Sequence, residues 1–581
     1  QFNCRNFSVS SVALRNDHLD RLETQRGNME KRGFDTFLEL LSSEGVEYLF
    51  GNPGTTELAI MEAVGKQQSI EYILGLQEAV VVAMADGYSR ASGKLSVANV
   101  HVAPGLGNAM GSIFNAKFYG SPVLITAGQQ EQGHGLMEPM LYDPLVPIAQ
   151  PLVKWAIECT QLADLPRIIR RAVKVALTPP TGPVFLSLPG DVLDDTLSSD
   201  IGSPTRIDTR VRPSEVVLEE LANKILSATN PVIVAGHELS TRNAIEEAMA
   251  FSEAIGAGVF QQTVAYSAQY RSEHRAFRGA LPRNQKVCHD LLAPHDLIIF
   301  LGADVLRMSV YSAIDPLPSS ARVIQIGERD WELGKNYPAE LAIRADIKET
   351  LLSLNKLLAQ KMSSTQKAVA AERLAEVEKT NWVTKREKLI VETEKLGDVT
   401  PILSAKLAMD IAAAIPTDAV VVEEALSSSF KLLDYVPLRD HQSYYGLASG
   451  GIGFATAGAI GISLALPNRP IVALIGDGSS MYSIQALWTA AHLKRPITYI
   501  IANNRGYKIL KQRLRSFRKA ENYVGMEINN PAIDFVRMGE SMGLTSTRVQ
   551  DPKDLKDAIE RGIKSNAPNL IEVEISADLD T

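Results

Sequence analysis

The sequence predicts an α/β protein made of three consecutive doubly wound domains, each built on a parallel sheet. The chain has 581 residues, enough at about 150 residues per domain for three or four domains with their own cores. From residue 29 onward, short apolar segments alternate with amphipathic helical segments, as in βαβ units whose sheet is covered on both faces. Hydrophobic residues make up 45% and charged residues 22%, which excludes a disordered or collagen-like chain.

The first predicted domain covers residues 29–198. An amphipathic helix at 34–45 precedes the first strand, and a turn at 52–54 leads into a helix capped by Thr55 or Thr56. The predicted strands are 46–51, 70–76, 95–102, 121–128 and 182–190. The polar residues 193–210, which contain Pro and Gly, indicate a linker.

The second and third domains repeat this alternation. The second covers 207–360, with predicted strands at 231–239, 257–264, 295–304 and 321–330. The charge-dense, helix-favouring residues 361–397 predict a long exposed connector. The third covers 398–581, with a helix at 402–415 and predicted strands at 419–424, 470–475, 496–504 and 570–575. Residues 1–28 contain no long apolar run and are interpreted as an extension outside the fold.

Two glycine-rich stretches resemble each other. Residues 105–111 and 451–458 both read as Gly-apolar-Gly turns followed by a small-residue helix and then a proline-led strand. This similarity indicates a distant duplication of one domain. The alternative is a coincidence between two unrelated glycine-rich α/β units.

Composition excludes several kinds of partner. The net charge of −8 disfavours nucleic acid and anionic membranes, which favour clustered Lys and Arg. Three scattered cysteines (Cys4, Cys159 and Cys288) form neither a disulfide framework nor a zinc site, which favours a reducing, cytoplasmic location. Residues 446–467 carry no charge over a membrane-spanning length, but they are glycine-rich and lack an aromatic or basic belt. They predict a tight loop and a buried small-residue helix.

The sharpest chemical signal is Gly476-Asp477-Gly478-Ser479, followed 27 residues after Asp477 by Asn504. Each motif ends a predicted strand, where open α/β sheets place their ligands. Glycines let the backbone approach a phosphate, and the oxygens of Asp477, Asn504 and a backbone carbonyl suit Mg²⁺. One Gly-Asp-Gly alone would read as an ordinary strand-end turn, and the second motif at this spacing favours the phosphate site.

These two motifs resemble the thiamine diphosphate (ThDP) motif of the pyruvate decarboxylase-like superfamily, and residues 476–507 are most similar to benzoylformate decarboxylase. The similarity extends through residues 29–581. It implies ThDP and Mg²⁺ as cofactors, with the aminopyrimidine on the first domain and the diphosphate on the third. It also implies sites between two subunits, hence a dimer or a homotetramer built as a dimer of dimers.

The resemblance implies catalytic roles for four residues. Glu78 matches the glutamate that hydrogen-bonds the aminopyrimidine and promotes activation of the cofactor, and His101 and His274 match acid–base groups. Thr55 stands where benzoylformate decarboxylase has a serine that contacts the substrate carboxylate. Without the resemblance, Glu78 and His274 would read as solvated side chains, His101 as a strand-end residue and Thr55 as a helix cap.

The resemblance also implies a cofactor-binding set. Ile452 matches the bulky apolar residue beneath the thiazolium ring, a role that plain core packing would mimic, and Ser427 matches a diphosphate-contacting serine although Leu426 replaces the expected threonine. The full set is Glu78, Ser427, Gly450, Ile452, Gly476, Asp477, Gly478, Ser479, Asn504 and Tyr507, with Asp477, Asn504 and Gly506 as metal ligands.

Departures from the family pattern bear on the substrate. Gly446 replaces a phenylalanine of the cavity, Thr55 narrows it, and Arg505 and Lys508 follow the Asn-Asn motif. If Arg505 and Lys508 face the entrance of the substrate cavity, that entrance is wider and more cationic. It then suits a polar or anionic 2-oxo acid as well as an aryl one. The alternative is that both are solvated surface charges. The sequence therefore predicts an enzyme that is not dedicated to benzoylformate.

Three functions remain open at this point. The first is decarboxylation of a 2-oxo acid to an aldehyde and CO₂, and the second is carboligation of the acetolactate synthase type. The third is a catalytically silent regulatory subunit, which the presence of Glu78, Asp477 and Asn504 disfavours. Whether the central domain binds FAD is left open.

Overall fold

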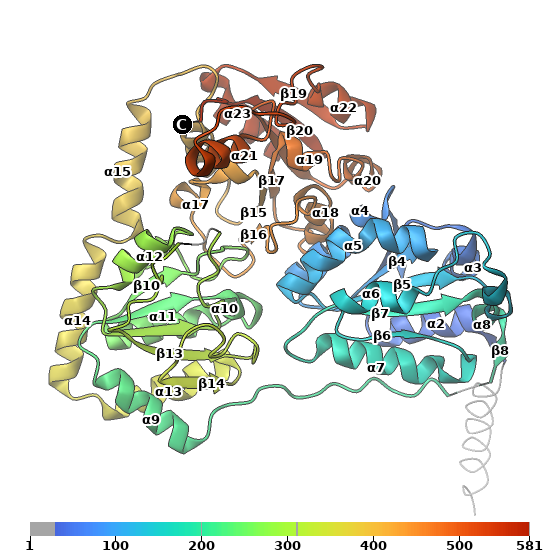
Figure 1. The fold of residues 1–581 in the computed structure, drawn as a ribbon, viewed down its shortest axis with the longest axis horizontal. Coiled ribbons are helices and arrows are strands. Elements are labelled where there is room, and N and C mark those ends of the chain that lie inside the picture. The colour runs from blue at the N-terminus through green and yellow to red at the C-terminus, as the bar shows by residue number, and fades with distance from the viewer. Residues whose placement is uncertain (1–29, 199, 310–311, 580–581) are drawn as a thin grey trace, which may run out of the picture.

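The computed structural model describes residues 30–198, 200–309 and 312–579. Three parallel six-stranded sheets follow one another along the chain, each covered by helices, so the predicted fold class is confirmed (Figure 1). A short antiparallel pair, β1 (Lys31–Arg32) with β8 (Thr196–Leu197), closes the first domain. The extension predicted at residues 1–28 lies outside the described residues.

The first sheet places its strands in the order β3 (Glu71–Leu74), β2 (Tyr48–Gly51), β4 (Ser96–His101), β5 (Val123–Gln129), β7 (Val184–Pro189) and β6 (Ala156–Glu158). Its helices are α2 (Gly33–Ser43), α3 (Leu58–Lys66), α4 (Glu78–Ser92), α5 (Val102–Tyr119), α6 (Leu145–Ala149), α7 (Leu165–Leu177) and α8 (Gly190–Asp194). Because every strand is parallel to its neighbours, their carboxyl ends lie along one edge of the sheet.

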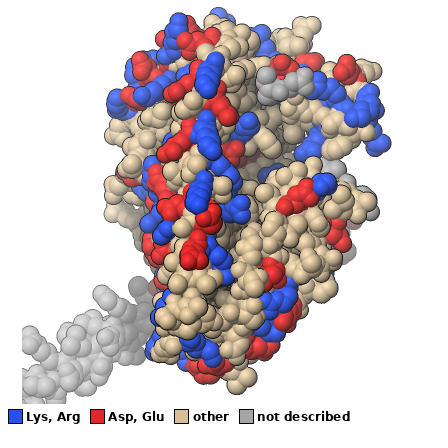
Figure 2. All heavy atoms as spheres, turned by 90° about the vertical axis from the view of Figure 1, so that its left-hand side faces the viewer, with Lys and Arg blue, Asp and Glu red and all other residues tan. Residues whose placement is uncertain are grey.

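The second sheet runs β11 (Phe277–Ala280), β10 (Gly258–Gln261), β9 (Pro231–Ala235), β12 (Leu297–Leu301), β13 (Arg322–Gly327) and β14 (Leu341–Arg344). The helices of this domain are α9 (Glu215–Leu226), α10 (His237–Thr241), α11 (Ile245–Ile255), α12 (Gln285–Leu292) and α13 (Ile347–Lys361). Two further helices, α14 (Ser364–Glu378) and α15 (Trp382–Glu394), connect it to the third domain. On the face that they form, positive and negative side chains alternate in a stripe (Figure 2), so this face presents no field of a single sign.

The third sheet runs β16 (Tyr444–Gly446), β15 (Val420–Glu424), β17 (Ile471–Gly476), β18 (Ile497–Asn503), β20 (Asn569–Glu574) and β19 (Thr545–Val549). Its helices are α16 (Ser404–Ala414), α17 (Leu432–Tyr435), α18 (Ala455–Ala465), α19 (Asp477–Ser480), α20 (Ala486–His492), α21 (Lys508–Arg513), α22 (Phe535–Ser541) and α23 (Pro552–Lys564). With strands numbered along the chain within each sheet, the first and third sheets share the order 2-1-3-4-6-5, and the second has 3-2-1-4-5-6. This shared order supports the predicted internal duplication, although residues 105–111 lie inside α5 rather than in a turn.

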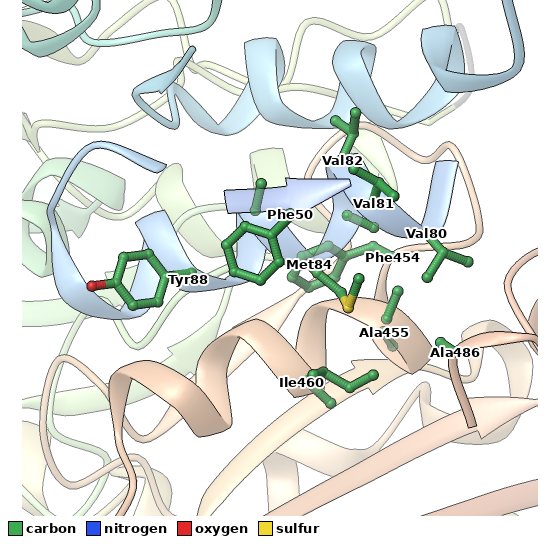
Figure 3. Packing of buried hydrophobic residues seen from close by; sticks show 14 of the residues in the cluster. Phe50, Val80, Val81, Val82, Met84, Tyr88, Phe454, Ala455, Ile460 and Ala486 are labelled. Carbon is green, nitrogen blue, oxygen red and sulfur yellow. The ribbon is translucent and has the colours of Figure 1, made fainter. Parts of the chain in front are cut away.

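The first and third domains share one hydrophobic core, in which α4 packs against α18. Figure 3 shows side chains of both helices meeting there: Val80, Val81, Met84 and Tyr88 from α4, with Phe454, Ala455 and Ile460 at the start of α18 and along it. The two backbones approach at glycines. A Cβ on Gly87 would overlap the carbonyl oxygen of Gly458, and one on Gly461 would overlap that of Met84. Only glycine permits this approach.

Arg90 joins the last turn of α4 to the third domain. Its Nε donates to Asp86 Oδ1 at 2.8 Å, and its Nη1 donates to the carbonyl of Gly446 at 3.2 Å. The guanidinium carbon lies 4.2 Å from the ring centroid of Tyr119 and 3.8 Å from that of Phe454. The helix that begins at Glu78 is therefore fixed at its far end by a buried, paired cation.

After Gly446, the last residue of β16, the uncharged stretch 446–467 forms a glycine turn and the buried helix α18, as predicted. Among the helices of the described residues, none combines the length and the apolar character that a membrane crossing requires.

Candidate functional site

Asp477 and Asn504 come together because β17 and β18 are neighbouring parallel strands, with Gly476 opposite Ala502. Asp477 Oδ1 accepts the N–H of Gly478 at 2.9 Å, and Oδ2 accepts that of Gly506 at 3.1 Å. Burial raises the pKa of Asp477 to about 6, against the lowering effect of these backbone donors. The buried Oδ1 of Asn504 has no hydrogen-bond partner among the described residues.

This arrangement fits a magnesium ion. An unpartnered buried amide oxygen, a buried carboxylate and the nearby backbone at Gly506 are oxygen donors of the kind Mg²⁺ prefers, and Mg²⁺ commonly binds through one or two carboxylates plus substrate phosphates. No cluster of three or more His, Cys, Asp or Glu side chains able to hold a metal occurs in the described part of the chain. A cation here would therefore depend on further oxygens, which a diphosphate supplies.

The residues that follow Asp477 are buried, and the ring of Tyr507 lies against Gly478. A Cβ on Gly478 would lie 2.6 Å from the ring of Tyr507, so this position has no room for a side chain. Ser479 is buried in α19, and the half-buried Ser427 lies in the turn η5 (Leu426–Ser429), against which α21 packs. These predicted diphosphate contacts therefore gather at one edge of the third sheet.

Glu78 lies in the first domain, at the first residue of α4, and is buried. Its two carboxylate oxygens accept hydrogen bonds from two asparagines, Oε1 from Asn52 Nδ2 at 3.3 Å and Oε2 from Asn108 Nδ2 at 3.1 Å. The surface alternative for Glu78 is therefore wrong. Sequence reasoning missed both asparagines; Asn52 belongs to the turn that precedes Thr55.

His101 ends β4 and pairs with a buried carboxylate that sequence reasoning also missed. Its Nδ1 lies 2.7 Å from Glu57 Oε2 and 3.2 Å from Thr56 Oγ1. Glu57 also accepts the N–H groups of Gly54 and Gly128, each at 2.9 Å. Nδ1 is thereby engaged, and Nε2 of His101 has no hydrogen-bond partner in the described ranges.

Thr55 is exposed beside this pair. The residue that caps the turn η1 (Thr55–Glu57) is Gly54, so the predicted cap at Thr55 or Thr56 is wrong. The Glu57 carboxylate acts as a capping group, because it accepts the hydrogen bond of the Gly54 N–H. Glu57 stands three residues after Gly54, and this spacing was the sequence feature that could have identified its carboxylate as the capping group.

His274 is placed within the central domain. Its Nδ1 lies 3.2 Å from the hydroxyl of Tyr270, and its Nε2 lies 3.2 Å from Glu253 Oε1. Burial lowers the pKa of His274, partly offset by Glu253. Within one chain, none of these contacts reaches Glu78 or Asp477.

The two groups of site residues lie in different domains of the chain. In the described ranges no hydrogen bond or ion pair joins the group around Glu78 and His101 to the group around Asp477 and Asn504. The structure thus places the predicted acid–base residues Glu78 and His101 in the first domain and the predicted diphosphate and metal ligands Asp477 and Asn504 in the third.

The residues that depart from the family pattern do not form the wider, more cationic entrance that the sequence suggested. Arg505 Nη2 pairs with Glu574 at 3.1 Å, and Lys508 is buried and donates to the carbonyl of Ser576 at 3.1 Å. Lys508 is therefore not a solvated surface charge. Gly446 lies in crowded backbone, where a Cβ would lie 2.7 Å from the Tyr444 hydroxyl oxygen, so the missing phenylalanine leaves no wide cavity.

Comparisons with known proteins match all three domains. Family models for thiamine pyrophosphate enzymes match residues 31–141 (N-terminal TPP binding domain), 218–354 (central domain) and 427–573 (C-terminal TPP binding domain). Benzoylformate decarboxylase of Pseudomonas aeruginosa is 32% identical over 538 residues, 92% of this chain and 97% of that protein. The acetolactate synthase large subunit of Haemophilus influenzae is 25% identical, covering 94% of both chains.

Solved structures agree with this. A thiamine diphosphate-dependent 4-hydroxybenzoylformate decarboxylase of Rhodococcus jostii superposes with a TM-score of 0.83 at 32% identity, over 94% of this chain and 100% of that chain. Benzoylformate decarboxylase of Polynucleobacter necessarius superposes with a TM-score of 0.84 at 28% identity, over 94% and 99%. With both TPP binding domains and the central domain matched in order, this chain belongs to the thiamine pyrophosphate enzymes, in the group that resembles benzoylformate decarboxylase.

Proposed function

We propose that this protein is a ThDP- and Mg²⁺-dependent carboxy-lyase that converts a 2-oxo acid into an aldehyde and CO₂. The observation that carries the proposal is the acid–base half of the site, in which Glu78 is held by two asparagines and His101 by a buried glutamate. A protein that only bound the cofactor would not require a histidine with one ring nitrogen fixed and the other left for proton exchange.

The third domain would hold the cofactor. Asp477, Asn504 and the carbonyl of Gly506 would bind Mg²⁺, and Gly478, Ser479 and Ser427 would contact the diphosphate, with Ile452 beneath the thiazolium ring. Bound ThDP supplies the carbon nucleophile and the electron sink of the reaction. The fit is supported by the unpartnered oxygen of Asn504 beside the buried carboxylate of Asp477.

The first domain would supply the residues that transfer protons. Glu78 would hydrogen-bond the aminopyrimidine of bound ThDP and hold the proton shared with it, while Asn52 and Asn108 keep the carboxylate in place. His101, oriented through Nδ1 by Glu57, presents Nε2 to donate the proton that the product aldehyde carries. Thr55 offers a hydroxyl to the substrate carboxylate, and His274 is a second candidate acid.

We further propose that a complete site forms between two copies of the chain. The separation of the two halves supports this, as do exposed apolar side chains near each half. In the first domain these are Leu58, Leu76 and Phe114, and in the third they are Phe430, Tyr482, Leu510 and Phe517. A two-fold dimer would pair the halves twice, and a dimer of dimers would give the homotetramer.

Complementation tests this arrangement. Glu78→Gln and Asp477→Ala chains are co-expressed with different tags, and the doubly tagged dimer is purified. One of its two sites combines an intact Glu78 with an intact Asp477, so we expect about half of wild-type activity per dimer. Each homodimer, which has lost one half of both sites, serves as the control. A mixed dimer no more active than either homodimer would place the site within a single chain.

The function itself is tested by product analysis. The protein, loaded with ThDP and Mg²⁺, is supplied with benzoylformate, aliphatic 2-oxo acids and dicarboxylic 2-oxo acids, and CO₂ and aldehyde are measured. We expect equal amounts of the two products from at least one substrate. Carboligation, which the acetolactate synthase relatives support as a second candidate, would release CO₂ with less aldehyde and a coupled hydroxyketone. A silent subunit would release neither.

For the substrate, we propose a 2-oxo acid that carries a second polar or anionic group. Arg505 and Lys508 no longer support this, because the structure gives both other partners. Other exposed cationic side chains lie at the end of α21 and in the residues that follow it. Helix α21 packs against the turn that contains Ser427. Three of these cationic side chains, Arg513, Arg518 and Lys519, have no ion-pair partner in the described ranges.

Salt dependence tests this substrate class. We expect kcat/KM for dicarboxylic substrates to fall between low and high salt, because exposed charges are screened, and to fall less in an Arg518→Ala/Lys519→Ala variant. A Lys367→Ala/Lys388→Ala variant, altered at exposed lysines of the connector helices α14 and α15, is the matched control. A hundredfold or larger preference for benzoylformate over every other acid would contradict the proposal.

A further inference from the structure

Ile452 is presented by a turn that two glycines make possible. Gly450 has φ of +86° and Gly453 has φ of +112°, both in the left-handed region that favours glycine. The turn leads directly into α18, which begins at Ala455. Ile452 is half-buried, so part of its side chain faces outward from the turn.

A buried carboxylate holds this turn from the side of the third sheet. Glu424, the last residue of β15, is fully enclosed and accepts three consecutive backbone N–H groups. The donors are Gly453 at 2.5 Å, Phe454 at 2.7 Å and Ala455 at 2.8 Å. These are the otherwise unpaired backbone donors at the start of a helix.

The first domain holds the same turn from the opposite side. Asn115 of α5 donates through Nδ2 to the carbonyl of Gly451 at 2.9 Å. Its Oδ1 accepts the hydroxyl of Ser449, and Ser449 Oγ accepts the N–H of Gly451 at 3.0 Å. The peptide before Ile452 is thus fixed by Asn115, and the N–H of the residue after it by Glu424.

We infer that Glu424 and Asn115 are positioning residues that hold Ile452 in place against the cofactor, one from each domain. The inference rests on the proposed role of Ile452 beneath the thiazolium ring. Neither side chain needs to touch the cofactor: Glu424 is enclosed by the turn it binds, and Asn115 contacts the backbone of Gly451. Their effect is to keep a two-glycine turn, which is flexible by itself, in one conformation before the cofactor arrives.

Two variants test the inference. Glu424→Gln keeps the size of the side chain but offers one acceptor oxygen and an N–H₂ group to three N–H donors, so at least one donor loses its partner. Asn115→Ala removes the contact from the first domain without placing any change in the third-domain core. Asp410→Asn is the matched control, because Asp410 is also a buried carboxylate of the third domain, paired with Lys406 on α16.

The first readout is amide hydrogen exchange in the cofactor-free protein. We expect peptides covering residues 446–460 to exchange at least about tenfold faster in Glu424→Gln and in Asn115→Ala than in the wild type. The second readout is ThDP affinity at saturating Mg²⁺, measured by calorimetry. We expect a loss of about 10–100-fold, the usual cost of removing a group that orients a ligand-contacting residue.

The outcomes separate this inference from the proposed function. Wild-type exchange and wild-type affinity in both variants, or losses equal to those of Asp410→Asn, would overturn it. If Glu424→Gln fails to fold, Asn115→Ala alone decides. Neither readout uses a 2-oxo acid, so a wrong substrate leaves the result intact, whereas failure of the wild type to bind ThDP would reject the proposed function first.

Discussion

Glu78→Gln is expected to slow decarboxylation by about 10²–10⁴-fold, the range associated with a positioned acid–base group. The substitution keeps the size of the side chain but removes the carboxylate that we propose shares a proton with the cofactor ring. It also leaves one asparagine, Asn52 or Asn108, facing an N–H₂ group instead of a carboxylate oxygen. ThDP affinity, measured by calorimetry, should change far less than turnover.

The informative measurement is exchange of the C2 proton of bound ThDP with solvent. Exchange at the wild-type rate in Glu78→Gln would show that Glu78 does not activate the cofactor. Glu71→Gln is a suitable control, because Glu71 is an exposed glutamate of the same domain, at the start of β3. It should leave both turnover and exchange unchanged.

Asp477→Ala is expected to weaken Mg²⁺-dependent ThDP binding by more than about 100-fold, because second-shell groups alone typically contribute 10–100-fold to metal affinity. Without the Asp477 carboxylate, the cation and the diphosphate would have only neutral oxygens and backbone groups to hold them. In the wild type, calorimetry should detect ThDP binding with Mg²⁺ and none with EDTA.

Asp418→Ala provides the comparison, since Asp418 is an exposed aspartate of the same domain. It should bind ThDP as the wild type does. Equal ThDP affinity in the wild type with and without EDTA would show that no cation bridges the diphosphate to the protein. Retained Mg²⁺-dependent binding in Asp477→Ala would place the cation elsewhere.

The proximity of Asp477 and Asn504 could be predicted because it depends on two strands that are consecutive in the sequence. Asp477 and Asn504 each end an apolar run, and two such runs with one crossover between them become neighbouring parallel strands. Their carboxyl ends therefore meet, whatever happens elsewhere in the chain. The same reasoning predicted the fold class, since alternation of strands and helices is read segment by segment.

Contacts between distant segments could not be predicted. Glu57 lies 44 residues before His101, and in the sequence it looks like an ordinary acidic residue near a helix start. Lys508 and Arg505 looked like a cationic entrance until the last strand, β20, proved to lie beside β18 and to bring Glu574 and Ser576 to them. No local pattern indicates that β20, rather than the preceding strand β19, lies beside β18.

The glycine contact between α4 and α18 makes function sensitive to mutation at a place where no chemistry occurs. Any side chain at Gly87 or Gly461 would force the two helices apart. Because α4 begins at Glu78, that displacement would move the acid–base carboxylate away from its asparagines. A substitution at either glycine would therefore lower activity as the loss of an active-site residue does, although neither glycine contacts the substrate.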